Sequence, residues 1–207
     1  METWVPAGLL AARLHSHRLS APAATVVGAA RHMLTVQSQD LLAGRWALGV
    51  RTSGAPTLDA VDAAFANGQL VRAWTQRGTL HIIPASDLAW VLSVTVGRQR
   101  QQAAGRRRAL GIDDGMLDAA WRPVGPSARD GGCTRADAFE LMRSAGIDPT
   151  GHRGIHVLFA LTIDGLICQG PIDRDGAGAV SREQRFVGTA EWVGESAQPG
   201  DPSSTVG

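Results

Sequence analysis

Two glutamines one residue apart are the side chains in this sequence that are best placed to do chemistry. Gln37 and Gln39 lie in the polar segment Val36-Gln37-Ser38-Gln39-Asp40, between two apolar stretches. Side chains two residues apart fall on one face of an extended chain, so both carboxamides would converge while Ser38 points away. Carboxamides donate and accept hydrogen bonds without carrying charge. The pair therefore suits either the positioning of a water molecule or a base edge, or the satisfaction of backbone groups at a helix start.

The basic side chains are the second feature with chemical meaning. All 20 are arginine, and the formal net charge is only +1. Guanidinium groups suit contacts to phosphate and guanine, although the codon usage of a GC-rich genome would give the same bias. Five fall within eleven residues that contain no acid: Arg98, Arg100, Arg106, Arg107 and Arg108. This block indicates either a solvated face or a surface that follows a phosphate backbone.

Composition limits the class of protein. The chain has 207 residues, a hydrophobic fraction of 44% and a mean hydropathy of −0.04, which are typical of a soluble globular protein. No stretch approaches the ~20 apolar residues of a membrane span, and no secretory signal is expected from the first residues. Cys133 and Cys168 are predicted to be unpaired thiols in a cytoplasmic protein. Neither they nor His15 and His17 have partners at metal-ligand spacing, so no metal or other cofactor is expected.

Periodicity divides the first 110 residues into helices followed by a hairpin. Residues 6–17, 22–33, 41–50 and 58–66 are predicted as helices, with Thr57 as the N-cap of the last. β-Branched residues between positions 70 and 84 predict a short hairpin, and Ser86 is expected to cap another helix. The arginine block follows on an extension of that helix or on a linker. Trp46 and Trp74 are expected in the core. Helices followed by a small hairpin are the outline of a winged-helix unit.

The same outline returns in the second half. Thr134-Arg135-Ala136-Asp137 predicts a capping box, followed by a helix at 152–163 and strands at 166–169 and 184–187, with a wing tip at 173–179. The Pro- and Gly-containing residues 121–132 are predicted to be a flexible approach. We therefore predict a mainly α protein with small β-wings (α+β), built from tandem winged-helix units at 1–110 and 111–193 and a disordered tail at 194–207.

Several ordered motifs resemble the winged-helix DNA glycosylases of the AlkZ/YcaQ type. They are Leu34-Thr35-Val36-Gln37-Ser38-Gln39-Asp40, Trp46-Ala47-Leu48-Gly49-Val50-Arg51-Thr52, Arg72-Ala73-Trp74, Arg77-Gly78-Thr79-Leu80-His81, Ala85-Ser86-Asp87-Leu88, Thr134-Arg135-Ala136 and Leu161-Thr162-Ile163-Asp164-Gly165-Leu166-Ile167-Cys168-Gln169-Gly170-Pro171. The resemblance implies hydrolysis of the N-glycosidic bond of cationic N7- or N3-alkylated purines, and unhooking of interstrand crosslinks. The family has an aliphatic residue where this chain has Ser38, and a third winged-helix unit. A fragment of reduced or no activity is therefore expected.

The resemblance also implies a set of site residues and partners. Gln37 and Gln39 would be the catalytic pair, with Asp40 orienting them. Double-stranded DNA would be the partner, in the nucleoid, and a separate chain that supplies the third unit is a candidate partner. Surface ion pairs are the alternative role for the arginines expected at DNA, and a backbone contact is the alternative for the histidine at 81. The residues expected to contact DNA are Arg51, Arg72, Arg77, His81, Arg106, Arg107, Arg108, His152 and Arg153.

Two other classes of function fit the same sequence. A non-catalytic winged-helix DNA-binding protein or regulator would use the arginine surface without excising a base. A scaffold would bind no DNA at all. Salt-dependent binding to duplex DNA separates the scaffold from the other two, and release of an alkylated base separates the enzyme from the regulator.

Overall fold

The computed structural model describes residues 8–174 and 180–194. Within them the helices are α1 (Leu9–Ser16), α2 (Val26–Met33), α3 (Leu41–Gly49), α4 (Leu58–Ala66), α5 (Leu88–Ala109), α6 (Asp114–Arg129), α7 (Arg135–Ser144), α8 (Arg153–Ile163) and α9 (Thr189–Val193). The strands are β1 (Val36–Gln37), β2 (Leu70–Trp74), β3 (Leu80–Pro84), β4 (Ile167–Arg174) and β5 (Val180–Gly188), with short 3-10 turns η1 (Gln76–Gly78) and η2 (Ala85–Asp87). Most of the predicted wing tip and of the predicted tail lies outside the described residues.

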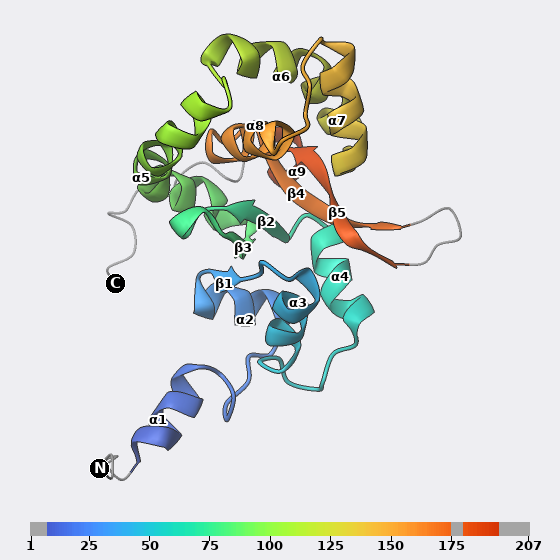
Figure 1. The fold of residues 1–207 in the computed structure, drawn as a ribbon. Coiled ribbons are helices and arrows are strands. Elements are labelled where there is room, and N and C mark those ends of the chain that lie inside the picture. Colours follow the sequence, from blue (N-terminus) through green and yellow to red (C-terminus); the bar gives the residue numbers. More distant parts are fainter. Residues whose placement is uncertain (1–7, 175–179, 195–207) are drawn as a thin grey trace.

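The described strands form one antiparallel sheet in the order β1-β3-β2-β4-β5. β2 pairs with β3 as the predicted hairpin, and β4 pairs with β5. The two hairpins meet through β2 and β4, where Arg72 lies opposite Gln169. In Figure 1 the sheet lies between α6, α7 and α8 above and α2, α3 and α4 below. The predicted α+β fold class is confirmed, and the hairpins of the two halves share a single sheet.

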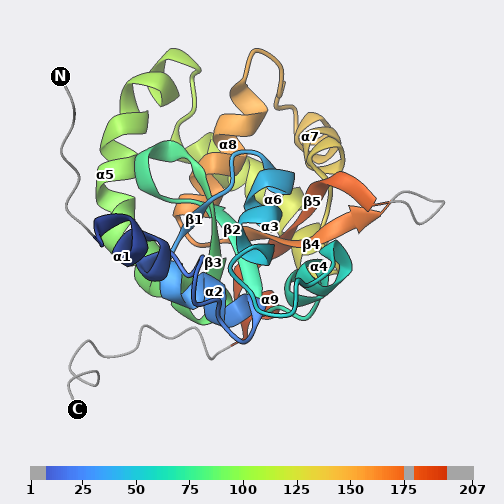
Figure 2. The same ribbon diagram turned by 90° about the horizontal axis from the view of Figure 1, so that it is seen from below.

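The hydrophobic core lies on both sides of this sheet, where the apolar faces of the helices pack against the strands. Below it, Leu48 of α3 and Phe65 of α4 are fully buried against Leu70 and Ile82 of the sheet. Figure 2 shows α2, α3 and α4 gathered around β1, β2 and β3 in this half, with α5 along one side. Above it, α6, α7 and α8 bury a second cluster that reaches Trp74. The central strand β2 is consequently buried at all five of its residues.

Predicted caps fix where several of the helices begin. Thr57 accepts a hydrogen bond from the backbone N–H of Ala60 at the start of α4. Thr134 and Asp137 form the predicted capping box at the start of α7. Ser86 does not cap α5, which begins two residues later at Leu88 after η2. None of the described helices is both long enough and apolar enough to cross a membrane.

Residues 121–132, predicted as a flexible approach, lie mostly within helix α6, so that prediction was wrong. Asp113 accepts a hydrogen bond from the N–H of Met116 at 2.8 Å and starts the helix. Leu117, Ala120, Val124 and Ala128 are all buried on one side of it. The helix itself continues through Pro123 and Pro126. Burial of the stripe outweighs the proline penalty that the composition suggested.

A buried ion pair joins α3 to α4. Arg45 Nη1 lies 2.8 Å from both carboxylate oxygens of Asp62, and the two side chains are 5% and 7% exposed. Two charges removed from water cost several kcal/mol each unless they satisfy one another. Arg45 is thereby neutralised within the fold.

A close contact between Ser38 and Gly44 fixes the glutamine segment on α3. A Cβ atom built on Gly44 would lie 2.2 Å from Ser38 Oγ and 2.9 Å from Ile82 Cδ1. Ser38 is only 1% exposed, so it has no room to withdraw. The small side chain of Ser38, where the resembling family has an aliphatic one, is therefore matched by a residue without a side chain on the facing helix.

Replacing Gly44 with alanine is expected to lower the free energy of unfolding by about 1–3 kcal/mol, because the methyl group overpacks the Ser38 contact. Alanine otherwise favours a helix by about 1 kcal/mol over glycine. Gly49→Ala, in the same helix with no atom within 4 Å of its built Cβ, is the matched control and should be neutral or stabilising. Urea unfolding measures both. Equal effects at the two positions would contradict the contact.

Replacing Asp62 with alanine should cost about 3–5 kcal/mol of stability, because it leaves Arg45 buried without its partner. Asp59→Ala removes an exposed acid from the first turn of the same helix and should cost no more than about 1 kcal/mol. The double replacement Arg45→Met, Asp62→Leu should recover most of the loss. A loss after Asp62→Ala no larger than that of the control would show that the pair is not needed.

Candidate active site

A cleft of about 530 Å³ opens on the sheet beside the glutamine segment. Its floor is formed by side chains of β2, β3, β4 and β5, and its walls come from the start of α3 and from α7 and α8. Both halves of the chain therefore contribute to it. The lining residues are Gln39, Asp40, Leu41, Leu42, Arg45, Arg72, Trp74, Leu80, Arg135, Ile155, Gln169, Glu183, Gln184 and Phe186.

The glutamine segment is extended, as its spacing predicted. Gln37 pairs with His81 across β1 and β3, and the Ser38 N–H donates to the Leu80 carbonyl at 2.8 Å. Gln37 and Gln39 are exposed while Ser38 is buried between them. The alternation puts both carboxamides on the open side of a strand whose backbone is held from below. Gln39 lines the cleft, whereas Gln37 lies outside its lining.

Arg72 holds this backbone in place. Its Nε donates to the Ser38 carbonyl at 2.8 Å, and its Nη2 to the Gln39 carbonyl at 3.1 Å. Its Nη1 donates to Gln169 Oε1 at 2.7 Å. Burial lowers the pKa of Arg72 to about 10, against the opposing attraction of Asp40, and the side chain stays charged at neutral pH. One guanidinium thus connects the glutamine segment to the second half of the chain.

The orientation of the Gln39 carboxamide follows from its partner. The Leu80 N–H donates to Gln39 Oε1 at 3.2 Å, and only an oxygen can accept there. The amide nitrogen of Gln39 is left with two donors. Among the described residues, none makes a hydrogen bond to the Gln37 side chain. Asp40 accepts from the Ala43 N–H at 2.9 Å as the N-cap of α3, so it fixes the start of that helix directly after Gln39.

Two residues predicted to contact DNA lie inside the fold. Arg72 is 7% exposed and His81 is 4% exposed. His81 Nδ1 lies 3.0 Å from Thr75 Oγ1 and 3.1 Å from the Thr79 carbonyl, and burial lowers its pKa. Burial argues against direct phosphate contact by either residue. His81 makes the alternative backbone contact, to the Thr79 carbonyl, whereas Arg72 makes internal hydrogen bonds in place of the surface ion pair that was its alternative.

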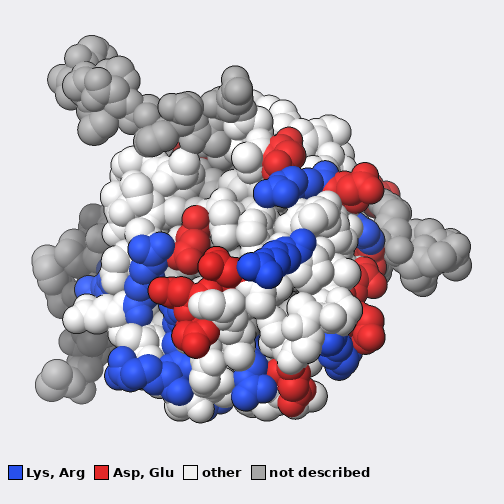
Figure 3. Space-filling view, turned by 90° about the horizontal axis from the view of Figure 1, so that it is seen from above, with Lys and Arg blue, Asp and Glu red and all other residues white. Residues whose placement is uncertain are grey.

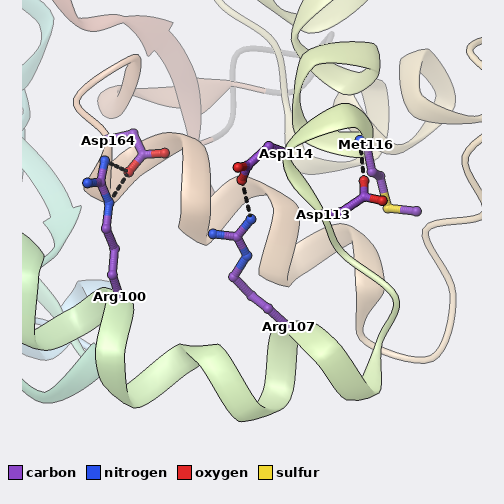
Figure 4. A network of polar contacts seen from close by, with 6 residues as sticks. All are labelled: Arg100, Arg107, Asp113, Asp114, Met116 and Asp164. Carbon is purple, nitrogen blue, oxygen red and sulfur yellow. Dashed lines mark hydrogen bonds and ion pairs between the residues drawn. The ribbon is translucent and has the colours of Figure 1, made fainter.

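Several of the other predicted DNA-binding arginines are engaged within the protein. Arg51 Nη1 donates to the Ala47 carbonyl at 2.8 Å. Arg153 donates to the carbonyls of Leu110 and Asp148. Figure 4 shows Arg100 and Arg107 rising from α5 toward acids on neighbouring elements. Their partners are Asp164 at 2.7 Å and Asp114 at 3.0 Å.

The remaining predicted residues, Arg77, Arg106, Arg108 and His152, are exposed. In the part of the chain that the structure describes, none of the four side chains forms an ion pair or a hydrogen bond. The face seen in Figure 3 carries basic and acidic side chains next to one another and has no broad basic surface. The arginine block on α5 therefore contains two kinds of side chain. Arg100 and Arg107 form ion pairs within the protein, whereas Arg106 and Arg108 form none with the described residues.

Sequence reasoning missed Gln169 and misplaced Trp46. Gln169 is 5% exposed and binds Arg72 from a position 97 residues away, and no local signal marks such a partner. Trp74 is buried as predicted, but Trp46 is 66% exposed. It lies one turn beyond Leu42 of the cleft wall. No group of three or more His, Cys, Asp or Glu side chains among the described residues is placed to hold a metal ion.

Comparisons with known proteins agree with this architecture. The DNA glycosylase AlkZ of Streptomyces sahachiroi has a similar fold, with a TM-score of 0.69 and 21% sequence identity. The similarity covers 89% of this chain and 49% of the AlkZ chain, so this chain spans about half the length of that protein. No curated protein sequence matches this one.

A family model for AlkZ-like DNA glycosylases matches residues 30–205. This match includes the glutamine segment, Arg72 and every residue that lines the cleft. The chain therefore belongs to the AlkZ-like DNA glycosylase family.

Proposed function

We propose that this chain hydrolyses the N-glycosidic bond of N7- or N3-alkylated purines in double-stranded DNA, including purines held in interstrand crosslinks. The observation that carries the proposal is the exposure of two carboxamides on an anchored strand at a cleft. Gln37 and Gln39 are exposed, while the backbone between them is bonded to Arg72. Family membership supports the same activity.

Hydrolysis of this glycosidic bond does not need a general acid to protonate the leaving base. An alkylated purine is already cationic, so it leaves the sugar with the bonding electrons and needs no proton. The transition state instead resembles a sugar oxocarbenium ion and needs a water molecule on the face opposite the leaving base. Neutral carboxamides suit both needs, because their oxygen dipoles face a developing cation and their hydrogen bonds orient a water.

The two glutamines would divide these tasks. The Leu80 N–H occupies the oxygen of Gln39, so its amide group is fixed in orientation and its N–H donors are available to a water oxygen. The oxygen of Gln37 is engaged by no described residue and would accept from that water or face the sugar. Arg72 would contribute by position alone, because its donors are committed to Ser38, Gln39 and Gln169.

The cleft would receive the extruded nucleotide. A base inside a duplex is out of reach of such a site, so it must leave the stack. A volume of about 530 Å³ lies within the range of small-ligand sites. Trp74, Leu80 and Phe186 provide apolar surface there. The charges of Arg45 and Arg135 in the lining are met by Asp62 and Glu183.

The hydrogen bond from the Leu80 N–H to Gln39 Oε1 also favours a second candidate function. A carboxamide that completes a strand ladder is a structural element, as in a DNA-binding protein that excises nothing. The two candidates differ in one observable, which is release of a base from alkylated duplex DNA.

Double replacement of Gln37 and Gln39 by alanine is expected to lower the rate of N7-methylguanine release from duplex DNA by at least about 100-fold. Binding to undamaged duplex should stay within about threefold, since neither side chain is assigned to phosphate. Gln101→Ala, an exposed glutamine on α5, is the matched control. Unchanged excision in the double variant would refute the catalytic assignment. Duplex binding without any base release by the unmodified chain would favour the second candidate.

Replacing Arg72 with lysine keeps the charge, but the donors of an ammonium group share one nitrogen and cannot reproduce the bonds that Nε, Nη1 and Nη2 make to three separated acceptors. Loss of the anchor should shift the glutamines and lower kcat for excision by about 100-fold with little change in KM. Gln169→Ala removes only the contact to the second half and should give a smaller loss of kcat. Thermal unfolding of each variant identifies simple destabilisation. A fall in stability with kcat intact would show that Arg72 supports the fold and not the site.

A further inference from the structure

A second cavity, of about 290 Å³, lies next to the cleft, is open to solvent and is lined mainly by residues of α5, α8 and η1. It shares Trp74 and Ile155 with the cleft but contains neither Gln37 nor Gln39. The proposed excision chemistry makes no use of it. The residues that line it are Trp74, Arg77, Gly78, Gln99, Gln102, Ala103, Arg106, Ile155, His156 and Phe159.

One face of α5 changes from apolar to polar residues where it reaches this cavity. Leu88, Val91 and Leu92 are buried at the beginning of the helix. The same face continues at helical spacing through Gln99, Gln102, Ala103 and Arg106, which all line the cavity. A seam between two packed helices ordinarily carries apolar residues. On this face Val96 still packs against the core, but beyond it the buried Gln99 and the exposed Gln102 and Arg106 line the cavity.

Gln99 is the clearest sign of a missing partner. It is 2% exposed, and its side chain makes no hydrogen bond with any residue in the described part of the chain. Its Oε1 lies 3.8 Å from a Cβ built on Gly78, at the cavity wall. The buried, unpartnered side-chain atoms of the described residues do not include its amide oxygen or nitrogen, so the Gln99 carboxamide opens onto the cavity. A ligand in the cavity would satisfy it.

Cationic and aromatic groups complete the lining. Arg77 and Arg106 are exposed, and within the described residues neither forms an ion pair or a side-chain hydrogen bond. His156 Nδ1 is buried without a partner, and burial, followed by the nearby Arg106, lowers the pKa of this histidine. The rings of Trp74 and Phe159 meet edge to face with centroids 5.9 Å apart.

We propose that this cavity binds one unstacked nucleotide, with the base between the aromatic wall and the carboxamides of Gln99 and Gln102, and the phosphate at Arg77 and Arg106. Aromatic faces stack on any base, carboxamides bond to base edges, and guanidinium groups bind phosphate. A volume of 290 Å³ is near the lower end of small-molecule sites. The nucleotide comes either from a DNA strand that passes the cleft or from solution. Only the first source rests on the proposed function.

Calorimetric titration of the full chain with 2′-deoxyadenosine 5′-monophosphate tests the cavity without any excision readout. Arg77→Gln, Arg106→Gln should weaken binding at least tenfold. Ala103→Leu, which fills the cavity without changing charge, should do the same. The matched controls are Arg98→Gln, Arg122→Gln, which removes two exposed arginines outside the cavity, and Ala109→Leu on the exposed end of α5. Both controls should bind as the unmodified chain does.

Four results would overturn the proposal: no binding by the unmodified chain, full binding by Ala103→Leu, an equal loss in the Arg98, Arg122 control, or equally tight binding of inorganic phosphate. A duplex with one unpaired adenosine separates the two sources. If Ala103→Leu abolishes its preference over a fully paired duplex, the nucleotide belongs to the strand. If the preference survives while the mononucleotide no longer binds, the ligand is a free nucleotide. Nucleotide binding without base release would refute the proposed function and leave this cavity assignment standing.

Discussion

The buried guanidinium of Arg72 is the interaction on which the site depends. β2 is buried throughout, and Arg72 is its one charged residue. A charge in such a strand costs several kcal/mol unless its donors are satisfied. The acceptors are two carbonyls of the glutamine segment and the side chain of Gln169. The same three bonds therefore stabilise the central strand, fix the catalytic candidates and join the two halves of the chain.

Other arginines of this chain are also bonded within the protein. Arg45 and Arg72 are buried, and Arg185 donates to the carbonyls of Gly131 and Gly132 as well as to Asp173. A planar group with five donors can connect several backbone carbonyls at once, which an ammonium group cannot do as well. Many of the arginines therefore act as internal braces. Arg77 and Arg106 belong to the arginines that make no such bond among the described residues, and both line the second cavity.

Local signals in the sequence were sufficient for most helices and strands. Thr57 and the Thr134 capping box marked helix starts correctly, and the alternation of Gln37, Ser38 and Gln39 gave the right faces. Long-range pairing was not accessible, since the Arg72 and Gln169 partners are 97 residues apart. The sequence shows that a side chain is basic but does not show that it is buried, so Arg72 and His81 were predicted to contact DNA. In α6, proline and glycine obscured a regular apolar stripe.

Gln37 and Gln39 are proposed to stabilise a cationic sugar at the edge of the cleft. The most direct measurement compares the affinity of the chain for two duplexes, one with a cationic pyrrolidine in place of the sugar and one with a neutral tetrahydrofuran. The pyrrolidine duplex mimics the cationic transition state, so a site that stabilises that state should bind it more tightly than the neutral duplex. We predict at least a tenfold preference for the cationic duplex, which disappears when both glutamines are replaced by alanine. Equal affinity for the two duplexes, or a preference that survives the replacement, would contradict the account.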